Sequence, residues 1–136
     1  MGTEITDLPS IKREVNMDDE TKYQLLHQEE EEAQVIIHCL YTGTMHDNNI
    51  RIWKSTFLDA KNSDHRSTLV HVENISMHPN WMHVKRGQTV NFTLIFTALP
   101  KDCNQFDMIE SIPESGGFVI QNIARNHSDV YTLKIT

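Results

Sequence analysis

The stretch QTVNFTLIFTAL, residues 88–99, decides the fold. Its large apolar residues recur at every second position, on one side of an extended chain: Val90, Phe92, Leu94 and Phe96. The residues between them are mostly polar, and this two-residue period is typical of a half-buried strand. Turn-forming pairs stand at both ends, Arg86-Gly87 and Leu99-Pro100. Because a strand with one apolar face needs a second layer to cover it, we expect the rest of the chain to supply that layer.

Short apolar stretches of the same kind recur through residues 34–136, and turn residues separate them. We expect strands at 34–42, in two pieces within 50–60 joined near Lys54-Ser55, and at 67–75, 88–99, 105–112, 118–124 and 129–135. The last two are expected to form a hairpin, and Trp81 is expected to fill the core. No convincing helical pattern lies between the stretches. The sequence therefore predicts an all-β fold, an antiparallel immunoglobulin-like β-sandwich of about seven or eight strands.

The acidic residues are concentrated at the start of the chain. Residues 1–33 contain ten Asp and Glu against three Lys and Arg, whereas residues 34–136 contain nine of each. We therefore divide the chain into an acidic N-terminal arm at 1–33, loose or forming a short helix, and a β-sandwich domain at 34–136. Neither part has the excess of Lys and Arg that phosphate contacts require, so nucleic acid is not expected as a partner.

The sequence shows no membrane-spanning or secretory segment. No apolar run approaches the roughly 18 to 20 residues that cross a bilayer, and the chain does not open with a basic stretch followed by an apolar one. We expect a cytoplasmic protein, unless a signal peptide has been removed. Two cysteines, Cys39 and Cys103, are too few for a disulfide framework. They are expected either as two reduced thiols or as one bridge.

Aromatic side chains are the best candidates for a binding site. Trp53, Trp81, Tyr41 and Tyr131 are the side chains most able to anchor a partner if they face the surface, and buried packing is the alternative. If Trp53 and Trp81 formed a flat exposed platform, they would suit a carbohydrate-binding module instead.

Support for catalysis is weaker. Of eight histidines, the nearest to a ligand set lie in the group His71, Glu73, His78 and His83, which we keep as the alternative of a small metal-dependent hydrolase. The chain has no Gly-x-Ser-x-Gly elbow, and neither cysteine has a basic or glycine-rich local context. We therefore expect no catalytic residue, no metal and no cofactor.

Five stretches together resemble a known group of proteins: IRIWKSTFL at 50–58, HVENI at 71–75, TLIFTALP at 93–100, FDMIES at 106–111 and GGFVIQNIARNHSDVYTLKI at 116–135. They resemble small bacterial all-β proteins of unknown function with an immunoglobulin-like sandwich. In that group an aromatic-rich strand ends in Leu-Pro and is followed by a Phe-Asp-x-Ile-Glu strand and a Gly-Phe hairpin. The resemblance covers roughly residues 34–136, and it implies a fold but no activity.

The function expected from the sequence is a soluble, non-enzymatic binding module of unknown ligand. Its partner would be another protein or a second copy of the chain, and a homodimer formed through a sheet edge or face is the most concrete form. Neither nucleic acid nor a membrane is expected as a partner.

Overall fold

The computed structural model describes residues 34–135, and the acidic arm predicted at 1–33 lies outside them. The described residues form nine strands, in chain order β1 (Val35–Thr42), β2 (Asn48–Ile50), β3 (Phe57–Ala60), β4 (Arg66–Glu73), β5 (Met82–Val84), β6 (Thr89–Phe96), β7 (Gln105–Ile109), β8 (Val119–Ala124) and β9 (Val130–Ile135). The prediction of an all-β fold is confirmed. Within this part of the chain no helix is long and apolar enough to cross a membrane.

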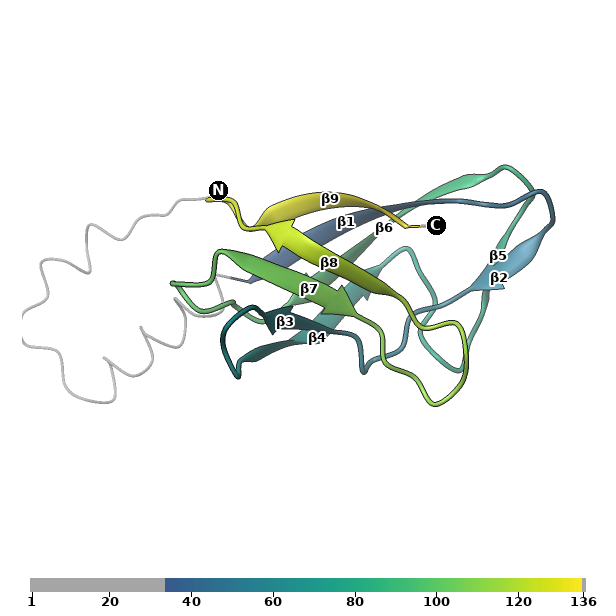
Figure 1. Ribbon diagram of the computed structural model, residues 1–136. Coiled ribbons are helices and arrows are strands. Elements are labelled where there is room, and N and C mark those ends of the chain that lie inside the picture. The colour runs from purple at the N-terminus through teal and green to yellow at the C-terminus, as the bar shows by residue number, and fades with distance from the viewer. Residues whose placement is uncertain (1–33, 136) are drawn as a thin grey trace, which may run out of the picture. The chain divides into compact units, whose positions relative to one another are not determined.

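Seven of the strands form one mixed sheet, in the order β8-β7-β3-β4-β6-β1-β9. Neighbouring strands are antiparallel except β1 and β9, which run parallel with Ile37 opposite Tyr131. The sheet is strongly curled into a half-barrel, and β7 and β8 lie in front of β1, β6 and β9 in Figure 1. The prediction of a purely antiparallel fold is therefore wrong at the β1–β9 pair. One curled sheet takes the place of two clearly separate ones.

The predicted hairpin between the last two strands does not form, although both strands exist. β8 pairs with β7 and β9 pairs with β1, at opposite edges of the sheet. The connection between them turns at Asp129, which has a φ of 54°, and its carbonyl accepts a hydrogen bond of 2.9 Å from the Ile36 amide. This hydrogen bond stands at the start of the β1–β9 pair. The connection from β8 to β9 therefore crosses from one edge of the curled sheet to the other.

Strand β6 lies between β4 and β1, and its alternation is as predicted. The four apolar side chains of the alternating face are all buried: Val90, Phe92, Leu94 and Phe96. They belong to a single core cluster with side chains such as Ile37 of β1 and Phe106 of β7. The layer that covers β6 is therefore supplied by the curl of its own sheet.

The two short strands β2 and β5 continue the β1–β6 pair beyond an interruption. The β1–β6 register ends with Thr42 opposite Thr89, and the β2–β5 register resumes with Asn48 opposite Val84. The Gly43 amide donates a hydrogen bond of 2.7 Å to the Gln88 carbonyl between the two pairs. After β2 the chain returns to the main sheet, and this return segment builds the site described next.

Candidate functional site

A pocket of about 350 Å³ opens where β1, β6 and β9 approach the β2 segment and the loop after β7. Its volume lies at the lower end of the range typical of small-ligand sites. The apolar part of its lining consists of Ile50, Ile52, Ile75, Phe92, Ile112, Phe118 and Ile135. The polar and aromatic part consists of Tyr41, Asn49, Arg51, Trp53, Trp81, Glu110, Glu114, Ser115 and Gly116. We call this site the tryptophan pocket.

Arg51 and Trp53 flank Ile52, a buried residue that anchors this segment and also lines part of the pocket. Ile52 is 2% exposed and forms an isolated parallel bridge with Met77. In an extended chain the residues on either side of a central residue point to the same face. A turn follows at once, in which the amide and the hydroxyl of Thr56 both donate to the Trp53 carbonyl. The core therefore sets the direction of both pocket residues.

Trp81 stands at the surface, with 56% of its area exposed, so the prediction that it fills the core is wrong. It directly precedes β5, which belongs to the small two-stranded sheet, and this position keeps the ring away from the core. The guanidinium carbon of Arg51 lies 3.7 Å from the centre of the Trp81 ring. Arg51 also donates hydrogen bonds to the Pro79 carbonyl at 3.1 Å and to Glu114 at 3.2 Å. A single side chain thus ties together the Trp81 segment and the loop after β7.

Glu110 contributes a buried carboxyl group to the pocket, since only 7% of the residue is exposed. Its Oε2 accepts a hydrogen bond of 3.0 Å from the Trp53 amide. Burial raises the pKa of Glu110, and this hydrogen bond and the charge of Arg51 oppose the rise in part.

The loop after β7 folds tightly over Glu110. The Glu110 amide donates to the Phe118 carbonyl at 2.8 Å, and a side chain at Gly117 would collide with the Glu110 carbonyl. Gly116, with a φ of 106°, supplies a backbone conformation that other residues rarely adopt. The two glycines therefore permit the tight loop that carries Glu114 and Ser115 of the pocket lining.

The two tryptophans do not make a bare platform. The His78 ring stacks on Trp53 with centres 3.6 Å apart and planes inclined by 18°. Arg51 lies over Trp81, so one face of each indole is already in contact with another side chain. The arrangement is the wall of a pocket, whereas a carbohydrate-binding platform would need two flat exposed rings.

The two candidate tyrosines lie in different places. Tyr41 lines the pocket, and its hydroxyl accepts a hydrogen bond of 2.6 Å from the Asn48 side chain. Tyr131 is 7% exposed, and it donates to Asp129 at 2.9 Å while accepting from the Asn126 amide at 3.1 Å. Burial raises the pKa of Tyr131 to about 12. Three of the four predicted anchors thus converge on the tryptophan pocket, and Tyr131 is packed inside.

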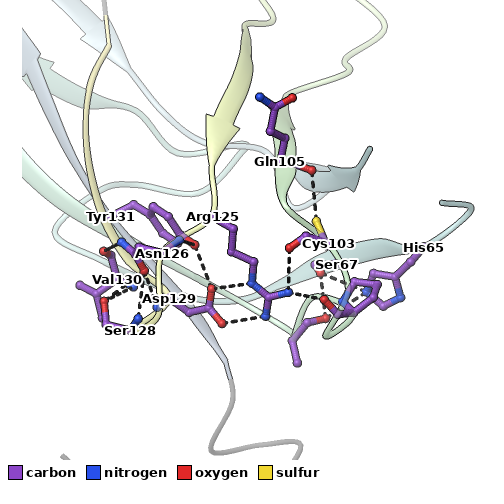
Figure 2. A network of polar contacts seen from close by, with 12 residues as sticks. His65, Ser67, Cys103, Gln105, Arg125, Asn126, Ser128, Asp129, Val130 and Tyr131 are labelled. Atoms are coloured by element: carbon purple, nitrogen blue, oxygen red, sulfur yellow. Dashed lines mark hydrogen bonds and ion pairs between the residues drawn. The ribbon is translucent and has the colours of Figure 1, made fainter. Parts of the chain in front are cut away.

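Tyr131 belongs to a polar network centred on Arg125, which Figure 2 shows. The guanidinium donates two hydrogen bonds to the Asp129 carboxylate, at 3.1 and 3.0 Å, and these raise the pKa of Arg125. It also donates to the carbonyls of Pro100 and Cys103 in the loop between β6 and β7. This network joins the turn between β8 and β9 to the loop between β6 and β7, and it therefore stabilises the relative position of these two segments.

A histidine and a serine meet beside this network without forming a nucleophilic pair. His65 Nε2 lies 3.1 Å from the Ser67 hydroxyl and 3.0 Å from the Ala98 carbonyl (Figure 2). Because a carbonyl oxygen only accepts, the contact with Ala98 places the proton on Nε2. That nitrogen then has no lone pair to take the serine proton, and the Ser67 hydroxyl itself donates to Ala98. Ser67 is also fully buried.

The side chains predicted as a metal-binding alternative are not brought together. His71 pairs with Glu73 at 3.4 Å on the exposed face of β4, as a simple polar pair on one strand. His78 stacks on Trp53, and His83 pairs with Asp47 at 3.4 Å. Within residues 34–135 no three His, Cys, Asp or Glu side chains are grouped as metal ligands.

The two cysteines are free thiols, which decides between the two expected states. Cys39 points into the core from β1 and is 1% exposed, while Cys103 is 5% exposed in the loop before β7. Burial raises the pKa of Cys39 to about 12. Neither thiol lines the tryptophan pocket.

Three charged residues of the pocket were not among the predicted site residues: Arg51, Glu110 and Glu114. The sequence offers a signal for Arg51, because the alternation of Ile50, Arg51, Ile52 and Trp53 places Arg51 on the same side of an extended chain as Trp53. It offers none for Glu110, whose partner Trp53 is 57 residues away.

Comparisons of the chain with protein-family models, with curated protein sequences and with solved structures gave no match. The fold and the site define a small all-β domain with a ligand-sized pocket. The resemblance drawn from the sequence predicted a small all-β domain, and this prediction is confirmed. No family is identified for the chain.

Proposed function

We propose that the chain is a non-enzymatic binding module that takes its ligand in the tryptophan pocket. The observation that carries the proposal is the convergence of Tyr41, Trp53 and Trp81 on one cavity, although they come from segments far apart in the sequence. Large aromatic side chains at the centre of a concave site are the usual anchors of binding.

The contacts around the pocket support a preformed site. Arg51 is only 11% exposed at its side chain, and it links the Pro79 carbonyl to Glu114 across the pocket. Trp53 is fixed by the His78 stack and by the bond from its amide to Glu110. A ligand that enters such a site has little protein order to create, which favours affinity.

The arrangement offers little for catalysis. Glu110 is one buried carboxyl, and Glu114, the other acidic residue of the lining, is already paired with Arg51. The described lining residues include no serine–histidine pair and no cysteine. These observations favour binding over turnover.

Saturation-transfer NMR tests the proposal with a fragment set of cationic, anionic and neutral compounds. We expect a subset to receive magnetisation from the wild-type protein and to lose most of it with Trp81→Ala. Val70→Ala is the matched control, because Val70 is also exposed but lies on β4 outside the lining. Binding that is equal in all three proteins, or no binding in any class, would contradict the proposal.

Self-association is a second candidate, favoured by exposed valines on the two edge strands. Among the described strands β8 and β9 end the sheet, with Val119 56% and Val130 39% exposed. An uncovered edge is a ready surface for a second copy. Size-exclusion chromatography with light scattering would show a dimer that Val119→Lys or Val130→Lys weakens. A clean monomer across micromolar concentrations contradicts this form.

A further inference from the structure

We propose that the tryptophan pocket recognises an alkylammonium group, as carried by a lysine side chain or a free amine. The inference rests on the proposed function and names the chemical class of ligand for the same site. It follows from the charges, the hydrogen bonds and the aromatic contacts of the lining residues.

The lining carries more negative than positive charge. Arg51, Glu110 and Glu114 are the lining residues with charged side chains. Arg51 forms its ion pair with Glu114 at 3.2 Å, and its other bond goes to the neutral Pro79 carbonyl. Glu110 feels the charge of Arg51 but forms no ion pair with it, so the lining keeps one net negative charge, which a single positive group in the pocket would neutralise.

The second carboxylate oxygen of Glu110 can accept a hydrogen bond from a ligand. Its Oε2 is used by the Trp53 amide, and no described residue donates a hydrogen bond to its Oε1. An ammonium group brings three donors and a full charge, which makes the strongest kind of hydrogen bond to a carboxylate. An anion would meet repulsion from Glu110.

The contacts of Arg51 argue against the pocket as an anion-binding site. Its side chain is 11% exposed, one terminal nitrogen donates to Pro79 and the other to Glu114. Its guanidinium carbon lies over the Trp81 ring, 3.7 Å from the ring centre. Two of the five guanidinium donors are used in these hydrogen bonds, and its charge is paired with the carboxylate of Glu114.

The remainder of the lining suits the carbon stem of an amine. Trp81 is 56% exposed, and its contact with Arg51 demonstrates that this ring packs against a cation. Apolar side chains such as Ile112, Phe118 and Ile135 complete the lining. Long amines bury their methylenes on apolar surface and keep the charged end at a polar partner.

Protein-observed NMR titration tests the inference with four probes. The cationic pair is n-butylamine and N-acetyl-lysine methylamide. The neutral compound is N-acetyl-norleucine methylamide, which keeps the four side-chain carbons of lysine and lacks the ammonium group, and the anion is N-acetyl-glutamate methylamide. Both cations should shift amide signals of the pocket and bind about tenfold tighter than norleucine, since one charge-assisted bond is gained. Equal affinity of the two cations points to a free amine, and a preference for the lysine compound points to a peptide side chain.

The variant Glu110→Gln separates charge from shape, because glutamine still accepts the Trp53 amide. It should reduce the preference for lysine over norleucine to nearly one, whereas Glu73→Gln should leave it unchanged. Glu73 is the control because it is exposed and outside the pocket. If norleucine or the glutamate compound binds as tightly as lysine, or if no probe shifts the pocket, the inference is wrong. The proposed function is tested separately, by the fragment screen with Trp81→Ala and Val70→Ala.

Discussion

Phe106 of β7 and Tyr131 of β9 contact each other edge to face, with ring centres 5.1 Å apart and planes inclined by 78°. Their strands occupy the second and the last places in the seven-stranded sheet. Such a contact requires the sheet to curl until side chains of β7 and β9 reach each other across the interior, and Figure 1 shows this curl. The core therefore depends on this pair as well as on β6.

Phe106→Ala should destabilise the protein by about 3–5 kcal/mol, the usual loss when a fully buried phenylalanine is truncated. Phe106 is 0% exposed and lies in the core cluster. Urea unfolding followed by tryptophan fluorescence measures the change. Val119→Ala, at an exposed site on the next strand, should change the free energy of unfolding by less than about 0.5 kcal/mol. Similar losses in both variants would show that Phe106 does not pack in the core as described.

The strands were largely predictable from the sequence, because each depends on local alternation. Val90, Phe92, Leu94 and Phe96 are buried as the period-two pattern of residues 88–99 predicts. The pairing of strands was not predictable to the same degree. The parallel contact of Ile37 with Tyr131 joins residues at opposite ends of the described chain, and no local pattern records it.

The pocket was predictable only in its aromatic residues. Trp53 and Trp81 stand out by residue type, whereas the importance of Glu110 depends on a hydrogen bond across 57 residues. The surface position of Trp81 depends on β5 leaving the main sheet, which its flanking residues do not indicate.

Arg125→Met should cost about 2–4 kcal/mol, because it leaves Asp129 partly buried without its partner. The two side chains are 17% and 14% exposed, and the bond is bidentate. A double-mutant cycle with Asp129→Asn, monitored by urea unfolding, isolates the pair. Asparagine is the right replacement because position 129 has a positive φ, which asparagine tolerates. A coupling energy near zero would mean that the network of Figure 2 does not hold the loops together.

Asp107 and Glu110 should give opposite pH dependence of stability. Burial would raise the pKa of Asp107, but the Asn122 amide and Lys61 lower it below the ordinary 3.8. Its stabilising contribution is complete above pH 3.8 and is lost as the pH falls through the folded-state pKa. The pKa of Glu110 is raised above 4.5, so its contribution is complete below pH 4.5 and is lost as the pH rises through the folded-state pKa.

Urea unfolding across acid and neutral pH measures both effects. The stability advantage of wild type over Asp107→Asn should shrink as the pH falls below 3.8. Relative to Glu110→Gln, wild type should gain stability as the pH falls from neutral towards 4.5. If both differences stay constant with pH, neither carboxyl has the environment described.

Cys39 should be inert to thiol reagents in the folded protein. Burial raises its pKa to about 12, so almost none of it is thiolate at neutral pH. Cys103→Ser leaves Cys39 as the sole cysteine, and serine can still donate to the Gln105 carbonyl as the thiol does. Labelling with a chromogenic disulfide reagent should occur only after denaturant is added. Rapid labelling of the native variant would contradict the position of β1 in the core.

The central claim is that Trp53, Trp81 and Glu110 line one binding pocket, and ligand mapping on the isotopically labelled protein tests it most directly. With a fragment that binds in the screen, or with N-acetyl-lysine methylamide, the indole N–H signals of both tryptophans should shift together with the amides of Glu110 and Gly116. All four should saturate with one dissociation constant. Shifts confined to the exposed faces of β4 and β6, with both indole signals unmoved, would contradict the account.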